Sequence, residues 1–264
     1  MAMKYPSSLS NLLFVDIETV SSTATYEDLS PAMQKHWDRK ASILSRGEEI
    51  APEQMYVDKA AIYAEFGKII TIGLGYLHFR ESGSLPELRL TVLASDDERE
   101  LLQTFADMLQ KMKHPGLTLC GHNAKEFDFP YLSRRMLVCG IPLPDVLDTG
   151  GKKPWEVMHI DTMELWKFGD YKSYTPLDLL ASLFEVPTSK EGIDGSQVGA
   201  AYYQEQALDK IAKYCLEDVR VTAQVYLRLK GLPALGEEQI VRSLPDHPQQ
   251  VGQEETAVKV QTIA

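Results

Sequence analysis

Two carboxylates follow an apolar run near the start of the chain, in the sequence Leu12-Leu13-Phe14-Val15-Asp16-Ile17-Glu18-Thr19. On a β-strand, successive side chains point to opposite faces, so Asp16 and Glu18 would share one face while Ile17 points into a core. Two neighbouring carboxylates repel each other and are costly to remove from water. A divalent cation would neutralise them, whereas the alternative is a strand that ends in a solvated acidic turn.

The bulk composition limits the class of protein. The chain has 264 residues, of which 44 % are hydrophobic, enough for one large α/β domain or two small ones. Its net charge of −11 argues against tight, sequence-independent binding to long duplex DNA, but not against a site that grips a strand end through metal ions. No apolar run is long enough to span a bilayer and no signal peptide is present, so we expect a cytoplasmic protein with no membrane partner.

The three cysteines, Cys120, Cys139 and Cys215, lie in apolar contexts and form no CxxC pair. No histidine stands at ligand spacing from any of them. We therefore expect reduced, buried thiols and no zinc site.

The remaining pattern predicts an α/β fold, a mixed five-stranded sheet flanked by helices. We expect strands at 11–18, 68–77, 88–94, 116–121 and 157–161, the first three forming an antiparallel meander. We expect helices at 95–112, 127–138, 175–184, 197–205 and 207–230, the first of them capped by Ser95 with Glu98 in a capping box. Residues 1–231 would form one domain with a helical insertion at 20–66, and residues 232–264 a weakly ordered tail.

Further carboxylates stand where they could join Asp16 and Glu18. Asp128 follows the fourth predicted strand, and it could serve a site or merely cap the next helix. Tyr214 and Asp218 are four residues apart and share a face of the last long helix, next to an apolar stripe. For Asp161 we favour a structural role, as a cap or as a hydrogen-bond acceptor for the backbone.

In this order, Asp16-x-Glu18, Asn123-x4-Asp128 and Tyr214-x3-Asp218 resemble the motifs of the DEDD superfamily of 3′–5′ exonucleases, tyrosine subgroup. Over residues 11–230 the chain looks like the proofreading exonuclease domain of family B DNA polymerases as a stand-alone protein, because too few residues follow for an attached polymerase domain. The flanking segments that carry this likeness are 66–73, 160–165, 177–181 and 193–196. The resemblance implies a ribonuclease-H-like fold.

The resemblance also implies a chemistry. Asp16, Glu18, Asp128 and Asp218 would hold two divalent cations, Mg²⁺ or Mn²⁺, with Asp16 shared between them. Glu18 and Asp218 would complete the ion that carries the attacking water, and Asp128 would hold the second ion. Tyr214 would orient that water rather than deprotonate it, since the ordinary tyrosine pKa is about 10.

The implied substrate is the 3′ end of single-stranded nucleic acid, DNA being favoured, with release of nucleoside 5′-monophosphates. Thr19, Val20, Asn123 and Phe127 would contact the terminal nucleotide, although Phe127 could equally belong to the core. Two alternatives are a non-catalytic nucleic-acid-binding module on the same fold and a nuclease for very short oligonucleotides, which the acidic composition suits. Candidate phosphate contacts are Lys125, Arg134, Arg135, Lys152, Lys153, Lys167, Lys172 and Lys190.

Overall fold

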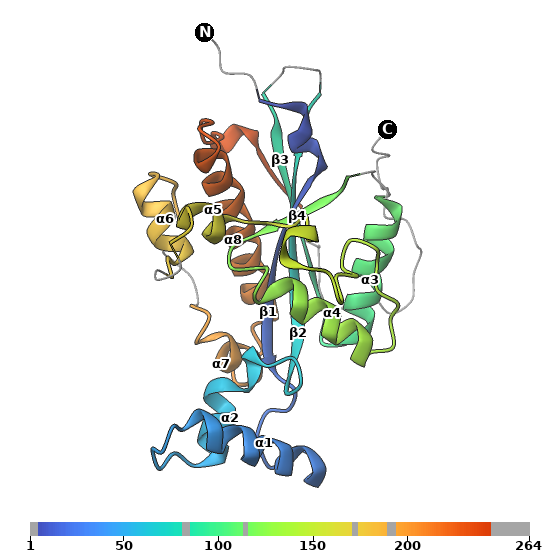
Figure 1. The fold of residues 1–264 in the computed structure, drawn as a ribbon, viewed down its shortest axis with the longest axis vertical. Coiled ribbons are helices and arrows are strands. Elements are labelled where there is room, and N and C mark those ends of the chain that lie inside the picture. Colours follow the sequence, from blue (N-terminus) through green and yellow to red (C-terminus); the bar gives the residue numbers. More distant parts are fainter. Residues whose placement is uncertain (1–4, 81–84, 113–115, 171–173, 189–193, 244–264) are drawn as a thin grey trace.

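The computed structural model describes residues 5–80, 85–112, 116–170, 174–188 and 194–243, and these build an α/β fold around one mixed sheet (Figure 1). Among the described residues the sheet has six strands, in the order β5-β4-β1-β2-β3-β6, so the expected count of five is wrong. The additional strand, β6 (Ile240–Ser243), pairs in parallel with β3 (Glu87–Ala94). It escapes sequence analysis because it is four residues long and mostly exposed, so it lacks an alternating apolar pattern.

The central strands have the predicted topology. β1 (Leu12–Ser21), β2 (Gly67–His78) and β3 form the antiparallel meander, which confirms that expectation. β4 (Thr118–Gly121) and β5 (Ile160–Asp161) continue the sheet in parallel with β1. The carboxyl ends of three parallel strands therefore meet at one edge, where α/β sheets gather their functional groups.

Helices cover both faces of the sheet (Figure 1). The long helix α8 (Leu208–Leu229) lies with α5 (Thr162–Lys167) and α6 (Leu177–Leu183) on one side, and α3 (Glu98–Lys111) and α4 (Asp128–Val138) lie on the other. The other helices are α1 (Pro31–Leu44), α2 (Pro52–Lys59) and α7 (Val198–Tyr203), with 3₁₀ turns at Ser7–Asn11, Ala60–Ile62, Pro154–Glu156 and Glu237–Gln239. Within the described part of the chain, no helix combines the length and the apolar character that crossing a bilayer requires.

Strand β1 divides its side chains between two cores, as alternation predicts. Leu13, Val15 and Ile17 pack into the cluster under α3 and α4. Phe14 faces the opposite way, into the cluster formed with α8, where its ring meets that of Tyr226 edge-on at 5.7 Å. Asp16 and Glu18 continue this second face, so β1 directs both carboxylates toward α8.

The insertion at 20–66 folds around a small core of its own. Trp37 of α1 is fully buried there, and its indole N–H donates to the Pro52 carbonyl oxygen at 2.8 Å. The segment is joined to β1 because the Thr19 hydroxyl donates to the Ala61 carbonyl oxygen at 2.9 Å. In Figure 1, α1 and α2 lie beyond the carboxyl end of β1.

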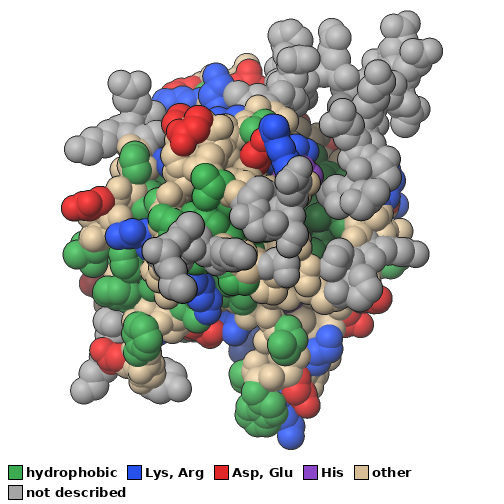
Figure 2. Space-filling view, turned by 90° about the horizontal axis from the view of Figure 1, so that it is seen from above, with side chains coloured by type: hydrophobic (Ala, Val, Ile, Leu, Met, Phe, Trp, Pro, Cys, Tyr) green, Lys and Arg blue, Asp and Glu red, His purple; other side chains and the backbone are tan. Residues whose placement is uncertain are grey.

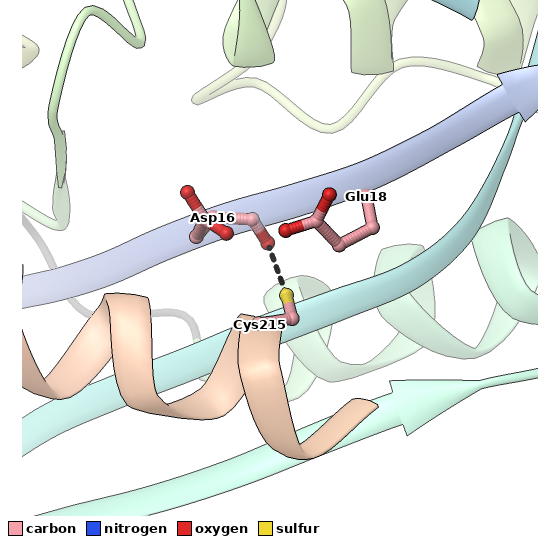
Figure 3. A group of neighbouring side chains, drawn as sticks. All are labelled: Asp16, Glu18 and Cys215. Carbon is pink, nitrogen blue, oxygen red and sulfur yellow. Dashed lines mark hydrogen bonds between the residues drawn. The ribbon is translucent and has the colours of Figure 1, made fainter. Parts of the chain in front are cut away.

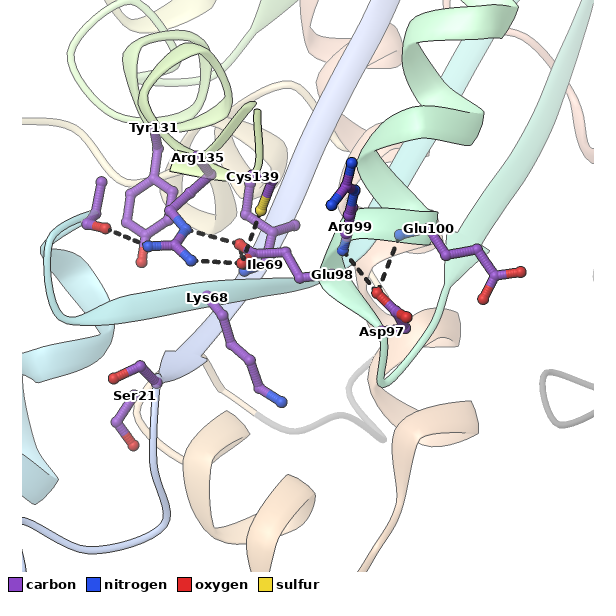
Figure 4. A network of polar contacts seen from close by, with 12 residues as sticks. Ser21, Lys68, Ile69, Asp97, Glu98, Arg99, Glu100, Tyr131, Arg135 and Cys139 are labelled. Atoms are coloured by element: carbon purple, nitrogen blue, oxygen red, sulfur yellow. Dashed lines mark hydrogen bonds and ion pairs between the residues drawn. The ribbon is translucent and has the colours of Figure 1, made fainter. Parts of the chain in front are cut away.

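A buried ion pair joins the helices of the other face (Figure 4). Asp97, not Ser95, caps α3, so the predicted capping box is wrong. Instead, the Glu98 carboxylate accepts the Ile69 N–H at 2.8 Å. It also forms an ion pair with Arg135, in which the Arg135 Nη2 lies 2.5 Å from Glu98 Oε2. Removing one partner of a buried pair typically costs about 3–5 kcal/mol, so this pair fixes α3 and α4 against β2.

Charges of both signs are interspersed on the surface. On the face seen in Figure 2, Lys and Arg side chains lie between acidic ones, and hydrophobic side chains are exposed among them. The net charge of −11 therefore does not describe a uniformly acidic surface, and local basic areas remain available.

Candidate active site

The two carboxylates of β1 meet α8 at Cys215 (Figure 3). One carboxylate oxygen from each of Asp16 and Glu18 and the Cys215 Sγ lie within 4.8 Å of one another. The Cys215 thiol donates to the Asp16 main-chain oxygen at 3.4 Å. Close approach is possible because Gly73 of β2 lies opposite Asp16, and a Cβ there would come within 3.0 Å of the Cys215 Sγ.

Asp128 contacts the same strand from the start of α4. It is the first residue of the helix and is only 5 % exposed, and its Oδ1 accepts the Ile17 N–H at 3.1 Å. This N–H is available because β4 pairs with β1 only as far as Phe14. The hydrogen bond therefore ties Asp128 to the strand segment between Asp16 and Glu18.

Tyr214 and Asp218 complete the group from α8, one turn apart. The Tyr214 hydroxyl and the Asp218 carboxylate interact, and each affects the pKa of the other. Asp218 in turn interacts electrostatically with Asp16 and Glu18. The structure thus brings together the four predicted metal-ligating carboxylates and the predicted tyrosine.

Burial and mutual repulsion dominate the electrostatics of these groups. Burial, together with the charges of the neighbouring carboxylates, raises the pKa values of Asp16 and Glu18 well above the ordinary range. Burial also raises the pKa of Asp128 to about 7 and that of Asp218 to about 6. In Tyr214, burial and the Asp218 charge raise the pKa, so its hydroxyl stays protonated at neutral pH.

The group has the chemistry of a hard-cation site. Asp16 Oδ2 is buried and has no hydrogen-bond partner among the described residues. Clustered carboxylate oxygens with unused lone pairs are the ligands that Mg²⁺ and Mn²⁺ prefer, and a cation would relieve their repulsion. These residues therefore fit the two divalent ions expected from the sequence.

The residues expected to contact substrate have mixed environments. The Val20 side chain is fully buried in a cluster with α7, which leaves only its main chain available to a nucleotide. Asn123 adopts a left-handed conformation (φ 58°) and its side-chain oxygen is buried without a partner among the described residues. The Phe127 ring is half-buried and packs on Tyr131 at 5.3 Å, so part of it serves the core, as the alternative proposed. The Thr19 hydroxyl is engaged by the insertion.

Asp161 organises the loop that leads to Asp128. Its carboxylate accepts N–H groups from Asn123 and Lys125, at 2.9 and 3.0 Å, as well as from Met163 and Glu164. The structural role expected for Asp161 is thus confirmed. Helix α5, which Asp161 caps, is missing from the predicted elements, although an aspartate as the last residue of a strand is a usable capping signal.

Some charged side chains have other partners than the sequence suggests. Glu217, the sequence neighbour of Asp218, pairs with Arg220 of α8 and Arg242 of β6. Arg135 is committed to Glu98, and Lys125 lies 2.8 Å from Glu164, which weakens both as phosphate contacts. Lys172 and Lys190 lie outside the described residues.

A model of a known protein family matches most of the chain. Residues 62–256, more than half of the chain, match a family described as "Predicted 3'-5' exonuclease related to the exonuclease domain of PolB"; the match includes Asp128, Tyr214 and Asp218 but begins after Asp16 and Glu18.

Similar curated proteins include DNA polymerases of Pyrococcus glycovorans (24 % identical over 48 % of this chain) and Thermococcus litoralis (23 % over 61 %), and DNA polymerase 1 of Pyrococcus abyssi (26 % over 48 %). The chain spans only 18 %, 10 % and 18 % of the length of these three relatives, respectively. A solved family B DNA polymerase from Pyrobaculum calidifontis is also similar, with a TM-score of 0.49 and 16 % identity, over 82 % of this chain and 24 % of that one. Because its family model covers most of the described fold, the chain belongs to the family of predicted 3′–5′ exonucleases related to the exonuclease domain of PolB.

Proposed function

We propose that the protein is a metal-dependent 3′–5′ exonuclease that removes nucleoside 5′-monophosphates from the 3′ end of single-stranded nucleic acid, DNA being favoured. The observation that carries this proposal is the convergence of Asp16, Glu18, Asp128 and Asp218 from three elements onto one acidic group, in which Glu18 and Asp128 are buried and Asp16 and Asp218 are partly buried. Packing within the fold does not account for carboxylates held so close together and away from water, whereas binding of cations does.

The four carboxylates would bind two divalent ions. Asp16 would be shared between both ions, Glu18 and Asp218 would complete one, and Asp128 would complete the other. When bound, Mg²⁺ or Mn²⁺ ions would lower the pKa of the attacking water and neutralise charge on the phosphate and the leaving oxygen.

The remaining groups orient the reactants. Tyr214 stays protonated, so it acts as a hydrogen-bond partner that positions water beside the scissile phosphate while Asp218 holds its hydroxyl in place. The main chain at Thr19 and Val20, the exposed part of Phe127 and the Asn123 amide would contact the terminal nucleotide. None of these contacts selects a base, which suits a strand-end nuclease.

The proposal is tested with 5′-labelled single strands and with dinucleotides, incubated with Mn²⁺, with Mg²⁺ or with a chelator. We expect a ladder that shortens stepwise from the 3′ end, that disappears in chelator and in the Asp16→Ala variant, and that persists in Asp209→Ala. Asp209 is a matched control because it is an exposed carboxylate at the start of α8.

Two outcomes would replace the proposal. Absence of product under every metal, with strand binding retained, would favour the non-catalytic binding module. Product from dinucleotides but not from longer strands would favour an oligonucleotide-degrading nuclease.

A further inference from the structure

An almost fully solvated tryptophan stands on the loop between α4 and β5. Trp155 is 75 % exposed, and Met158 close by is 76 % exposed. The turn that presents Trp155 is well defined, because it begins at Pro154 and the Glu156 carboxylate accepts the Lys153 N–H at 2.7 Å. A large apolar side chain held in water in this way contributes nothing to the core, so a binding role has to be considered.

Cations accompany this tryptophan. The Lys153 Nζ lies 5.3 Å from the centroid of the Trp155 ring. Neither Lys152 nor Lys153 has an acidic partner among the described residues, and both are exposed. In a chain with a net charge of −11, two adjacent unpaired lysines beside an exposed indole form a local site for an anionic, aromatic ligand.

The loop is attached to the part of the molecule that carries Asp128. His159 at its end packs its ring on Phe129 of α4, with 4.7 Å between ring centroids. Phe129 directly follows Asp128 in α4, so this ring contact attaches the end of the loop beside the carboxylate site.

We propose that Trp155, Lys152 and Lys153 form a secondary contact surface for single-stranded nucleic acid, in which Trp155 stacks on a base and the two lysines contact phosphates. This rests on the proposed function, because the surface would hold the strand whose 3′ end occupies the carboxylate site. Stacking and phosphate contacts tolerate any base sequence, and their benefit requires a strand long enough to reach them. The surface therefore favours longer strands over dinucleotides.

Binding is measured first, in chelator, by fluorescence anisotropy of labelled oligothymidylate and oligouridylate. We expect Trp155→Ala to weaken binding by about tenfold and Trp155→Phe to restore most of it, since a phenyl ring still stacks. In the Lys152→Ala/Lys153→Ala variant, the slope of log affinity against log salt should become shallower by about 0.7 for each lost phosphate contact. Leu137→Ala and Lys111→Ala are matched controls, because both residues are exposed and lie on other elements.

Hydrolysis is measured in parallel with oligonucleotides and with the nitrophenyl ester of thymidine 5′-monophosphate, which is too small to reach Trp155. We expect Trp155→Ala to raise KM for oligonucleotides by about tenfold and to leave turnover of the ester unchanged. Equal binding by wild type and Trp155→Ala would overturn the contact surface. Absence of hydrolysis of either substrate, with Trp155-dependent binding intact, would overturn the proposed function and leave the surface standing.

Discussion

At the scale of the residue, the buried carboxylates couple stability to pH. The pKa of Asp128 is raised to about 7 and that of Asp218 to about 6, chiefly by burial, whereas aspartate in an unfolded chain titrates near pH 3.9. Because the folded values are the higher ones, this contribution to stability is complete below about pH 4 and is lost as the pH rises through about 6–7.

We therefore expect the melting temperature in chelator to fall between pH 5 and pH 8, and Asp128→Asn to remove part of that fall. In this pH range the loss associated with Asp128 is on the order of 3 kcal/mol, since about two pKa units of its shift lie above pH 5 and each corresponds to about 1.4 kcal/mol. Calorimetry of wild type and Asp128→Asn across this range measures the difference. Melting temperatures that fall equally with pH in the two proteins would contradict the expectation. Added Mg²⁺ should raise the melting temperature of the wild type most at the higher pH.

Tyr214 offers a second test at this scale. The Tyr214→Phe change removes only the hydroxyl, the group to which the proposed function assigns the orientation of water. We expect kcat to fall by about 10- to 100-fold, whereas Mn²⁺ affinity measured by titration calorimetry changes little, because the four carboxylates remain. An unchanged kcat would remove Tyr214 from the mechanism.

At the scale of the element, the close packing of α8 on β2 depends on a glycine of that strand. A Cβ on Gly73 would lie 2.7 Å from Val219 Cγ2 and 3.0 Å from the Cys215 carbonyl oxygen, closer than atoms normally pack. Gly73→Ala should therefore displace the helix that carries Tyr214 and Asp218.

We expect Gly73→Ala to lower the free energy of unfolding by about 1–3 kcal/mol, the usual cost of overpacking. Activity should fall at least tenfold even at temperatures where the protein stays folded, because small displacements of reacting groups are costly. Denaturant unfolding and kcat measure the two effects. Gly199→Ala in α7 is the control, since a Cβ there meets no atom within 4 Å, and loss of activity in that variant would undermine the argument.

At the scale of the whole molecule, residues 232–243 pack against α8 and add a strand to the sheet, although they fall within the predicted tail. Leu232 and Leu235 are buried against α8, and the Gln224 side chain bonds to both the N–H and the carbonyl of Leu235. Arg242 of β6 then pairs with Glu217 of α8. These contacts support the helix that supplies two residues of the site.

A chain ending at Gly231 should be less stable than a chain ending at Ser243 by about 3 kcal/mol or more, since two buried leucines each contribute roughly 1.5–3 kcal/mol. Denaturant unfolding of the two proteins measures the difference, and comparing them isolates residues 232–243. Equal stability would show that this segment does not support α8.

Features that depend on residues close together in the chain can be predicted from the amino-acid sequence alone. The alternation in β1 places Asp16 and Glu18 on one face, and helical spacing pairs Tyr214 with Asp218. The helices and strands that carry these residues were predicted close to their observed bounds for the same reason. Local backbone geometry decides which neighbours share a face, and it needs no knowledge of the rest of the fold.

Features that join distant segments follow from the packing of the folded chain and cannot be predicted from local sequence. Asp128 binding the Ile17 N–H, Glu98 pairing with Arg135 instead of capping α3, and β6 pairing with β3 all link residues far apart in the chain. The same holds for Cys215 against the Asp16 carbonyl. Each of these contacts is one of several that the same side chain or strand could have formed, and the choice follows from which unpaired N–H, charge or strand edge the packed sheet brings within reach.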